Sequence, residues 1–136
     1  MKSKSWFQCG QTPVATEEAL IGLRARLRQV YTSADPCDYS LVVAEVAPET
    51  DGFDRLAIRL SYTRILGELT ASPALLAGTG LAVALILCDD NLSATLARLR
   101  MRLARATTVG RPPRVWLERL PPRFPMALDL LDELSE

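Results

Sequence analysis

The chain of 136 residues contains no histidine. Histidine is the usual general base near neutral pH and a frequent zinc ligand, so its absence excludes Ser–His and Cys–His nucleophile pairs. Cysteine is scarce as well, since only Cys9, Cys37 and Cys88 occur, far apart and without a C-x-x-C motif. This spacing argues against a disulfide framework and against a zinc site, and it indicates reduced thiols in a cytoplasmic protein. We expect neither a bound metal nor a cofactor.

A net charge of one sign is also missing, because 16 Lys and Arg residues balance 16 Asp and Glu residues. Without a global positive field, neither nucleic acid nor an acidic membrane surface is expected as a partner. The longest apolar run, Leu81–Cys88, is far too short to span a bilayer. The basic N-terminus has no apolar segment behind it, as a signal peptide would have. The sequence therefore predicts a soluble protein without direct membrane insertion.

Size and composition suit one globular domain, with 49% hydrophobic and 24% charged residues. Residues 1–15 lack periodicity and are interpreted as a leader or linker, which leaves a domain over 16–136. Apolar spacing and turn residues then predict the elements of that domain. They are a helix over 16–31, a strand over 39–46, a helix over 53–70, strands over 74–77 and 81–88, a helix over 92–106, a strand over 114–120 and a helix over 125–134.

This order places β-α-β-β-α-β between two further helices. It predicts an α+β fold with an antiparallel sheet and flanking helices, of the ferredoxin-like type, with strand order 4-1-3-2. That order puts the first and third strands at the centre of the sheet. Residues 40–46 and 81–88 are the two most apolar strands, as central strands should be, whereas 114–120 alternates like an edge strand.

Several strings resemble the GGDEF (diguanylate cyclase) domain, over roughly residues 16–134. The segment Glu18–Leu27 is similar to the opening D-x-L-T-G-L-x-N-R-R of that family, and helix 92–106 is similar to its later Ala-, Leu- and Arg-rich helix. Glu45 falls near the place of a metal-binding Asp at the end of the first strand. The turn Gly78-Thr79-Gly80 occupies the place of the acidic signature turn.

The chain departs from the family pattern at the residues that carry out the family's reaction. Cyclases of this kind join two GTP molecules with the help of metal ions, which carboxylate oxygens hold. The turn offers Thr79 and Gly80 in place of the acids, and the R-x-x-D inhibition motif would fall on Leu69–Ser72, which carries no charge. The resemblance therefore implies a degenerate GGDEF domain of nucleotide-cyclase palm-type fold, a pseudoenzyme with no catalytic residue, in which Glu45 is at most a residual ligand.

A second signal is a group of arginines, which suits bidentate contacts to an anion or to an acidic partner surface. Its members are Arg98, Arg102, Arg105 and Arg111, with Arg114 close behind, and the alternative interpretation is a solvated helix face. The first functional hypothesis is an interaction or regulatory module of bacterial cyclic di-GMP-type signalling, which binds a protein partner, an upstream signalling module or a second copy as a homodimer. The alternative is an unrecognised enzyme, with Glu45 and Asp89 as paired acids, or an assembly subunit of ferredoxin-like fold.

Overall fold

The computed structural model describes residues 11–77, 80–108 and 110–135. Its elements are, in chain order, α1 (Gln11–Ser33), the short 3-10 helix η1 (Pro36–Asp38), β1 (Tyr39–Glu45), α2 (Gly52–Thr70), β2 (Ala74–Ala77), β3 (Leu81–Leu87), α3 (Leu92–Ala106), β4 (Arg114–Arg119) and α4 (Phe124–Ser135). The strands form one antiparallel sheet in the order β2-β3-β1-β4. Counted from the other edge, this is the predicted order 4-1-3-2. The α+β class and the central places of β1 and β3 are therefore confirmed.

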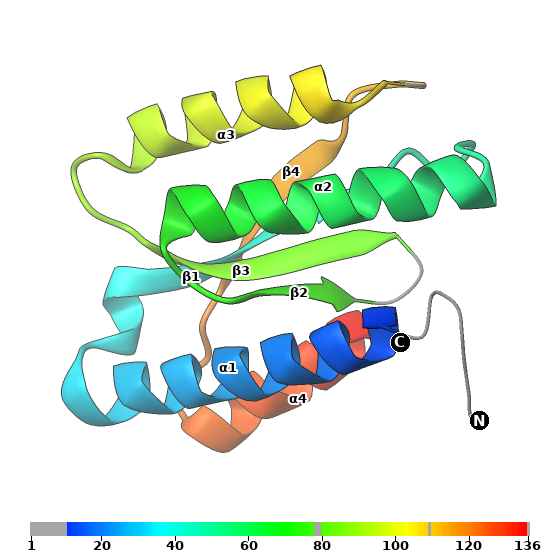
Figure 1. Ribbon diagram of the computed structural model, residues 1–136. Helices are drawn as coiled ribbons and strands as arrows, with labels where there is room; N and C mark the ends of the chain where they lie inside the picture. The colour runs from blue at the N-terminus through cyan, green and yellow to red at the C-terminus, as the bar shows by residue number, and fades with distance from the viewer. Residues whose placement is uncertain (1–10, 78–79, 109, 136) are drawn as a thin grey trace.

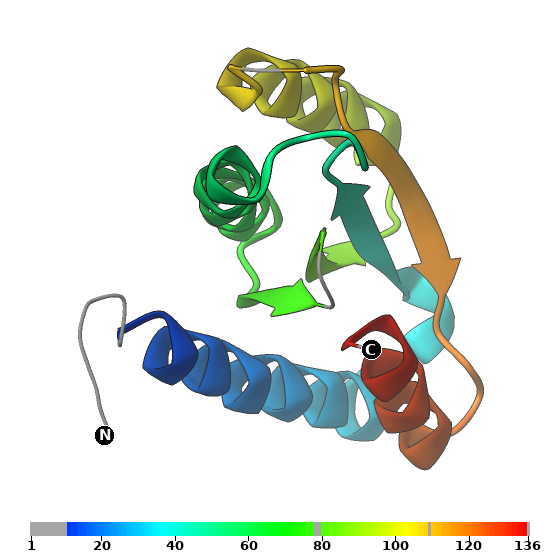
Figure 2. The same cartoon turned by 90° about the vertical axis from the view of Figure 1, so that its right-hand side faces the viewer.

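Helices cover both faces of the sheet. Helices α2 and α3 lie on one face, and α1 and α4 lie on the other (Figure 1). Figure 2 shows the resulting three layers, with the sheet between the two helix pairs. Because both faces of the central strands are buried, β1 and β3 are apolar along nearly their whole length instead of alternating.

The two cores on either side of the sheet follow from the alternation of side chains along a strand. In β1, Val42 and Ala44 pack under α2 and α3, whereas Leu41 and Val43 pack against α1 and α4. Helix α4 contributes buried Leu131 to the second core, and Ala127, four residues earlier on the helix, is buried as well. In the described part of the chain, no helix is long and apolar enough to cross a membrane.

The start of α1 differs from the prediction. The helix begins at Gln11, five residues before the expected N-cap at Thr16, so residues 11–15 of the predicted leader are helical. The expectation relied on Pro13 as a breaker, but proline is compatible with the first turn of a helix, where its missing N–H needs no partner. The rest of the predicted leader lies outside the described residues. The other predicted boundaries agree with the structure to within two residues.

Candidate functional site

The place to which the resemblance assigns an active site is the end of the sheet where β1 finishes and β3 begins. Glu45 lies opposite Leu81 in the β1–β3 register. Directly beyond this pair, the backbone N–H of Val46 donates to the carbonyl oxygen of Gly80 at 2.9 Å. The fold thus brings Glu45 beside the predicted turn. Two members of that turn, Gly78 and Thr79, lie outside the described residues.

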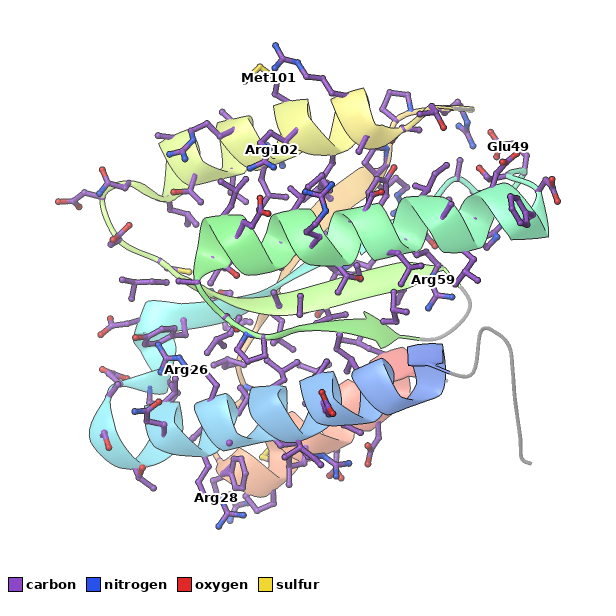
Figure 3. All side chains as sticks on the ribbon, viewed as in Figure 1. Arg26, Arg28, Glu49, Arg59, Met101 and Arg102 are labelled. Atoms are coloured by element: carbon purple, nitrogen blue, oxygen red, sulfur yellow. The ribbon has the colours of Figure 1, made fainter. Side chains whose placement is uncertain are left out.

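Both carboxylates at this end of the sheet are paired with arginines. Glu45 contacts Nη1 of Arg114 at 3.4 Å. Glu49, in the loop after β1, accepts hydrogen bonds from Nε and Nη2 of Arg111 at 2.5 and 2.9 Å. These hydrogen bonds lower the pKa of Glu49 to about 2 and raise the pKa of Arg111. Figure 3 shows Glu49 close to the N-terminal end of α2.

A third guanidinium group, that of Arg55, lies in the same region. Its Nη2 donates to the carbonyl oxygens of Ala47, Pro48 and Thr50, at 3.4, 2.5 and 3.2 Å. A Cβ atom added at Gly80 would come within 2.9 Å of Nη1 of Arg55. The arginine therefore lies between the β1–α2 loop and the turn before β3, and glycine is the residue that leaves room for it.

Arg59 follows one helical turn after Arg55 on α2. Burial lowers the pKa of its guanidinium group, and the nearby charge of Arg55 adds to this effect. Figure 3 places the Arg59 side chain by the ends of β2 and β3 nearest the turn. We refer to Glu45, Glu49, Arg55, Arg111 and Arg114 as the sheet-end cluster. Its three guanidinium groups and two carboxylates make it cationic.

The space inside the sheet-end cluster is small. A cavity of about 50 Å³ is lined by Glu45, Val46, Ala47, Pro48, Arg111, Pro112 and Arg114. Ligand pockets usually measure about 300–1,000 Å³, so a nucleotide does not fit into this cavity as it stands. Among the described residues, no group of three or more Cys, Asp or Glu side chains could hold a metal ion.

The predicted arginine patch is divided between two places. Arg102, labelled on α3 in Figure 3, pairs with Glu68 of α2 at 2.9 Å. Arg98 and Arg105 are exposed on α3. Arg111 belongs to the sheet-end cluster instead. The sequence could not show this division, because Glu49 and Glu68 come from segments distant from the arginines.

The alternative of Glu45 and Asp89 as paired acids is wrong. In the antiparallel register, Glu45 lies opposite Leu81, while Tyr39 lies opposite Leu87, two residues before Asp89. Glu45 and Asp89 therefore belong to opposite ends of the strands, since the step from Leu81 to Leu87 alone spans about 20 Å at 3.4 Å per residue. Asp89 has a local role, since its Oδ1 accepts from the backbone N–H of Asn91 at 3.0 Å in the turn before α3.

Sequence reasoning missed two members of the cluster, Glu49 and Arg55. Both come from the segment between β1 and the first turn of α2, where no spacing pattern marks them. The apolar run of β1 predicts where the strand ends, but not which side chains of the following loop turn back toward it.

Comparison of the chain with protein-family models, with curated proteins and with solved structures finds no match.

Proposed function

We propose that this chain is a catalytically inactive GGDEF-like domain of ferredoxin-like, cyclase palm-type fold. It acts in the cytoplasm as a protein-interaction or regulatory module of bacterial cyclic di-GMP-type signalling. The strand order 4-1-3-2 and the position of α2 and α3 on one face support the fold assignment. The observation that carries the functional proposal is that Glu45 and Glu49 are each held by an arginine.

This pairing opposes metal-assisted phosphoryl chemistry at the sheet end. Magnesium binds through carboxylate oxygens and substrate phosphates. At this site the oxygens of Glu49 accept two hydrogen bonds from Arg111, and Glu45 faces Arg114. A metal ion would have to displace guanidinium groups from both carboxylates. The site is therefore built as an ion-pair cluster, which holds the loop after β1 against the segment before β4.

The proposed interaction role is supported by exposed apolar side chains on α2. Phe53, Leu56 and Leu60 are 83%, 39% and 44% exposed. They are three and four residues apart, so they lie on one side of the helix, away from buried Ile58 and Tyr62. We call these three residues the α2 stripe. Contiguous exposed apolar side chains mark interaction surfaces. In the proposed role, the stripe binds a protein partner, an upstream signalling module or a second copy of the chain.

The catalytic half of the proposal is tested by incubating the purified chain with GTP and Mg²⁺ and separating the nucleotides by chromatography. We expect no cyclic di-GMP above the level of a protein-free control. The Glu45→Gln variant should give the same result, since Glu45 serves an ion pair. Formation of cyclic di-GMP by the chain, abolished by Glu45→Gln, would contradict the proposal.

The interaction half is tested by photocrosslinking in a lysate of the source organism, with the crosslinker placed at Ala57 beside the stripe. The crosslinked species should disappear in the Phe53→Ser/Leu60→Ser variant and persist in the Met101→Ser variant, whose change lies on the exposed side of α3. Crosslinks that are equally strong in all three proteins, or absent from all three, would contradict the role of the α2 stripe.

A further inference from the structure

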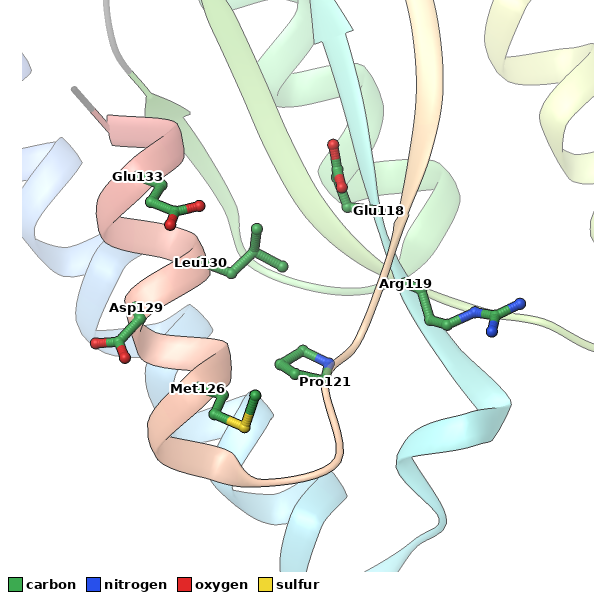
Figure 4. Close-up of a pocket in the computed structure, with 7 residues that line it drawn as sticks. All are labelled: Glu118, Arg119, Pro121, Met126, Asp129, Leu130 and Glu133. Carbon is green, nitrogen blue, oxygen red and sulfur yellow. The ribbon is translucent and has the colours of Figure 1, made fainter.

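A second hollow lies on the opposite side of the molecule from the α2 stripe, between the edge strand β4 and helix α4. Its volume is about 360 Å³, within the usual range for ligand sites. Pro121, Met126 and Leu130 supply its apolar surface, and Glu118, Asp129 and Glu133 supply carboxylates. Figure 4 shows Met126, Leu130 and Glu133 extending from α4 toward β4. We call this hollow the β4–α4 groove.

The walls of the groove are fixed by contacts elsewhere in the fold. The hydroxyl of Tyr31 on α1 donates to the carbonyl oxygen of Pro121 at 2.5 Å. Arg28 lies over the ring of Phe124, 5.3 Å from its centroid, and Arg24 pairs with Asp132 at 3.6 Å. These contacts use the other sides of the β4–α4 loop and of α4. Among the lining carboxylates, Glu118 accepts a hydrogen bond from Nε1 of Trp116 at 2.9 Å, and Asp129 and Glu133 are exposed on α4.

The strand that forms one wall has an open edge. Strand β4 ends the sheet order, and within the described residues no other strand pairs with its outer side. An extended peptide can add to such an edge through backbone hydrogen bonds, while alternate side chains enter pockets beside it. The groove lies on the α4 side of β4, the side to which Trp116 points. It could therefore receive every second side chain of an added strand.

The charges of the groove determine which side chains of an added strand it can bind. Glu118, Asp129 and Glu133 contribute three carboxylates. Arg119 is the cation among the lining residues, and Figure 4 shows its side chain directed away from α4, beyond the strand. Because opposite charges steer and orient binding, the complementary segment carries Lys or Arg. The apolar surface around exposed Met126 accommodates an aliphatic side chain of varied shape.

We propose that the β4–α4 groove binds an extended segment of a partner protein in which basic and aliphatic side chains alternate along one face. The partner strand lies beside β4, its basic groups meet the three carboxylates, and its aliphatic groups contact Leu130, Met126 and Pro121. The groove lies at the Glu118 end of β4, whereas Arg114, the residue of β4 that belongs to the sheet-end cluster, begins the strand, and the α2 stripe lies on the other face of the sheet. The inference therefore stands or falls independently of the proposed function.

The test is an NMR titration of the ¹⁵N-labelled chain with the peptide acetyl-Lys-Thr-Leu-Thr-Lys-Thr-Leu-amide. Its Lys and Leu side chains share one face of the extended form. We expect saturable shifts of backbone amides in β4 and α4. The Asp129→Lys/Glu133→Lys variant should weaken binding about tenfold or more, since two attractive charges become repulsive. Both residues are exposed on α4, so this variant is expected to fold.

The matched control is Asp54→Lys/Asp90→Lys, which changes the net charge equally at sites on the α2 and α3 side of the sheet, across the sheet from the groove. This variant should bind the peptide as the unaltered chain does, and a peptide with Glu in place of Lys should not bind. Three results would overturn the inference: no saturable shifts, shifts centred outside β4 and α4, or equal weakening in both variants. Equal weakening would mean that only the overall charge of the protein attracts the peptide.

Discussion

The hydroxyl of Tyr62 is buried beneath the helix pair α2 and α3 and meets Oγ1 of Thr107, just past the end of α3. The Thr107 hydroxyl donates its single proton to the carbonyl oxygen of Leu103 at 2.8 Å. Tyr62 therefore acts as the donor of the pair and Thr107 as the acceptor. This chain of hydrogen bonds ties the core of α2 to the C-terminal end of α3.

Removing the acceptor and removing the donor of this hydrogen bond should lower the unfolding free energy by different amounts. Thr107→Val leaves the buried Tyr62 hydroxyl without its acceptor, which costs about 1–3 kcal/mol of unfolding free energy. Tyr62→Phe removes the buried donor itself and should cost about 1 kcal/mol. In the Tyr62→Phe background, Thr107→Val should cost clearly less than it does alone. Urea denaturation measures these values, and strictly additive losses would contradict the hydrogen bond between Tyr62 and Thr107.

At the same scale, Glu49 makes the stability of the folded chain depend on pH. Its pKa in the folded chain is about 2, against 4.5 for an unperturbed glutamate, because Arg111 donates hydrogen bonds to it. Between these two pH values Glu49 binds a proton in the unfolded chain but not in the folded chain. Lowering the pH through this range therefore removes the contribution of Glu49 to the free energy of unfolding. The contribution of Glu49 is thus complete above about pH 4.5 and lost as the pH falls toward 2.

The corresponding experiment compares the melting temperatures of the unaltered chain and the Glu49→Gln variant between neutral pH and pH 2. The unaltered chain should melt slightly higher at neutral pH, and the gap should close below pH 4.5. The gap is expected to be small, because both partners are exposed. A gap that stays constant or widens in acid would contradict the role of the Arg111 pair.

At the scale of elements, helix α1 approaches the sheet closely at Gly22. A Cβ atom there would lie 3.1 and 3.3 Å from the Cγ and Cβ atoms of Pro73, directly before β2. The absence of a side chain thus lets α1 pack against the edge of the sheet. Gly22→Leu should push the helix away and lower the unfolding free energy by about 1–3 kcal/mol. Ile21→Ala, at a neighbour that is 67% exposed, should change it by less than about 0.5 kcal/mol.

Thermal or urea unfolding of these two variants distinguishes a tight contact from a loose one. If Gly22→Leu is as stable as Ile21→Ala, α1 does not depend on this contact for its position. If Gly22→Leu is more stable than the unaltered chain, the gain in helix propensity outweighs the contact with Pro73. Either result would contradict the packing argument.

The elements were largely predictable because each carries its own local signal. The unbroken apolar runs of β1 and β3 indicate strands that are covered on both faces, and the alternation in β4 indicates an edge. The start of α1 was missed because Pro13 is equally compatible with a loop and with a first helical turn. Local sequence does not distinguish these two states.

At the scale of the whole molecule, the candidate sites depend on contacts that no local pattern reveals. The Glu49–Arg111 pair joins residues 62 positions apart, and the Glu45–Arg114 pair joins residues 69 positions apart. The sequence predicts that Glu45 lies at a strand end, but not that Arg114 faces it. In the same way, the β4–α4 groove arises only when α4 packs back against α1 and leaves its acidic side beside β4.

The three layers also separate the surfaces of the molecule. The sheet-end cluster lies at one end of the strands, the α2 stripe lies on the outside of one helix layer, and the β4–α4 groove lies on the other side of the sheet. A protein with separate contact surfaces can join two partners at once, which suits a regulatory module. The central claim remains that the sheet-end cluster is an ion-pair cluster rather than a nucleotide site.

That claim is tested most directly by adding Mn²⁺ and GTP to the ¹⁵N-labelled chain and recording the paramagnetic broadening of its amide signals. The account predicts no saturable, localised broadening at Val46, Gly80 and Leu81, the described amides closest to Glu45. Strong broadening of these three signals that saturates with GTP, and that Glu45→Gln removes, would show a metal–nucleotide site at the end of the sheet and contradict the account.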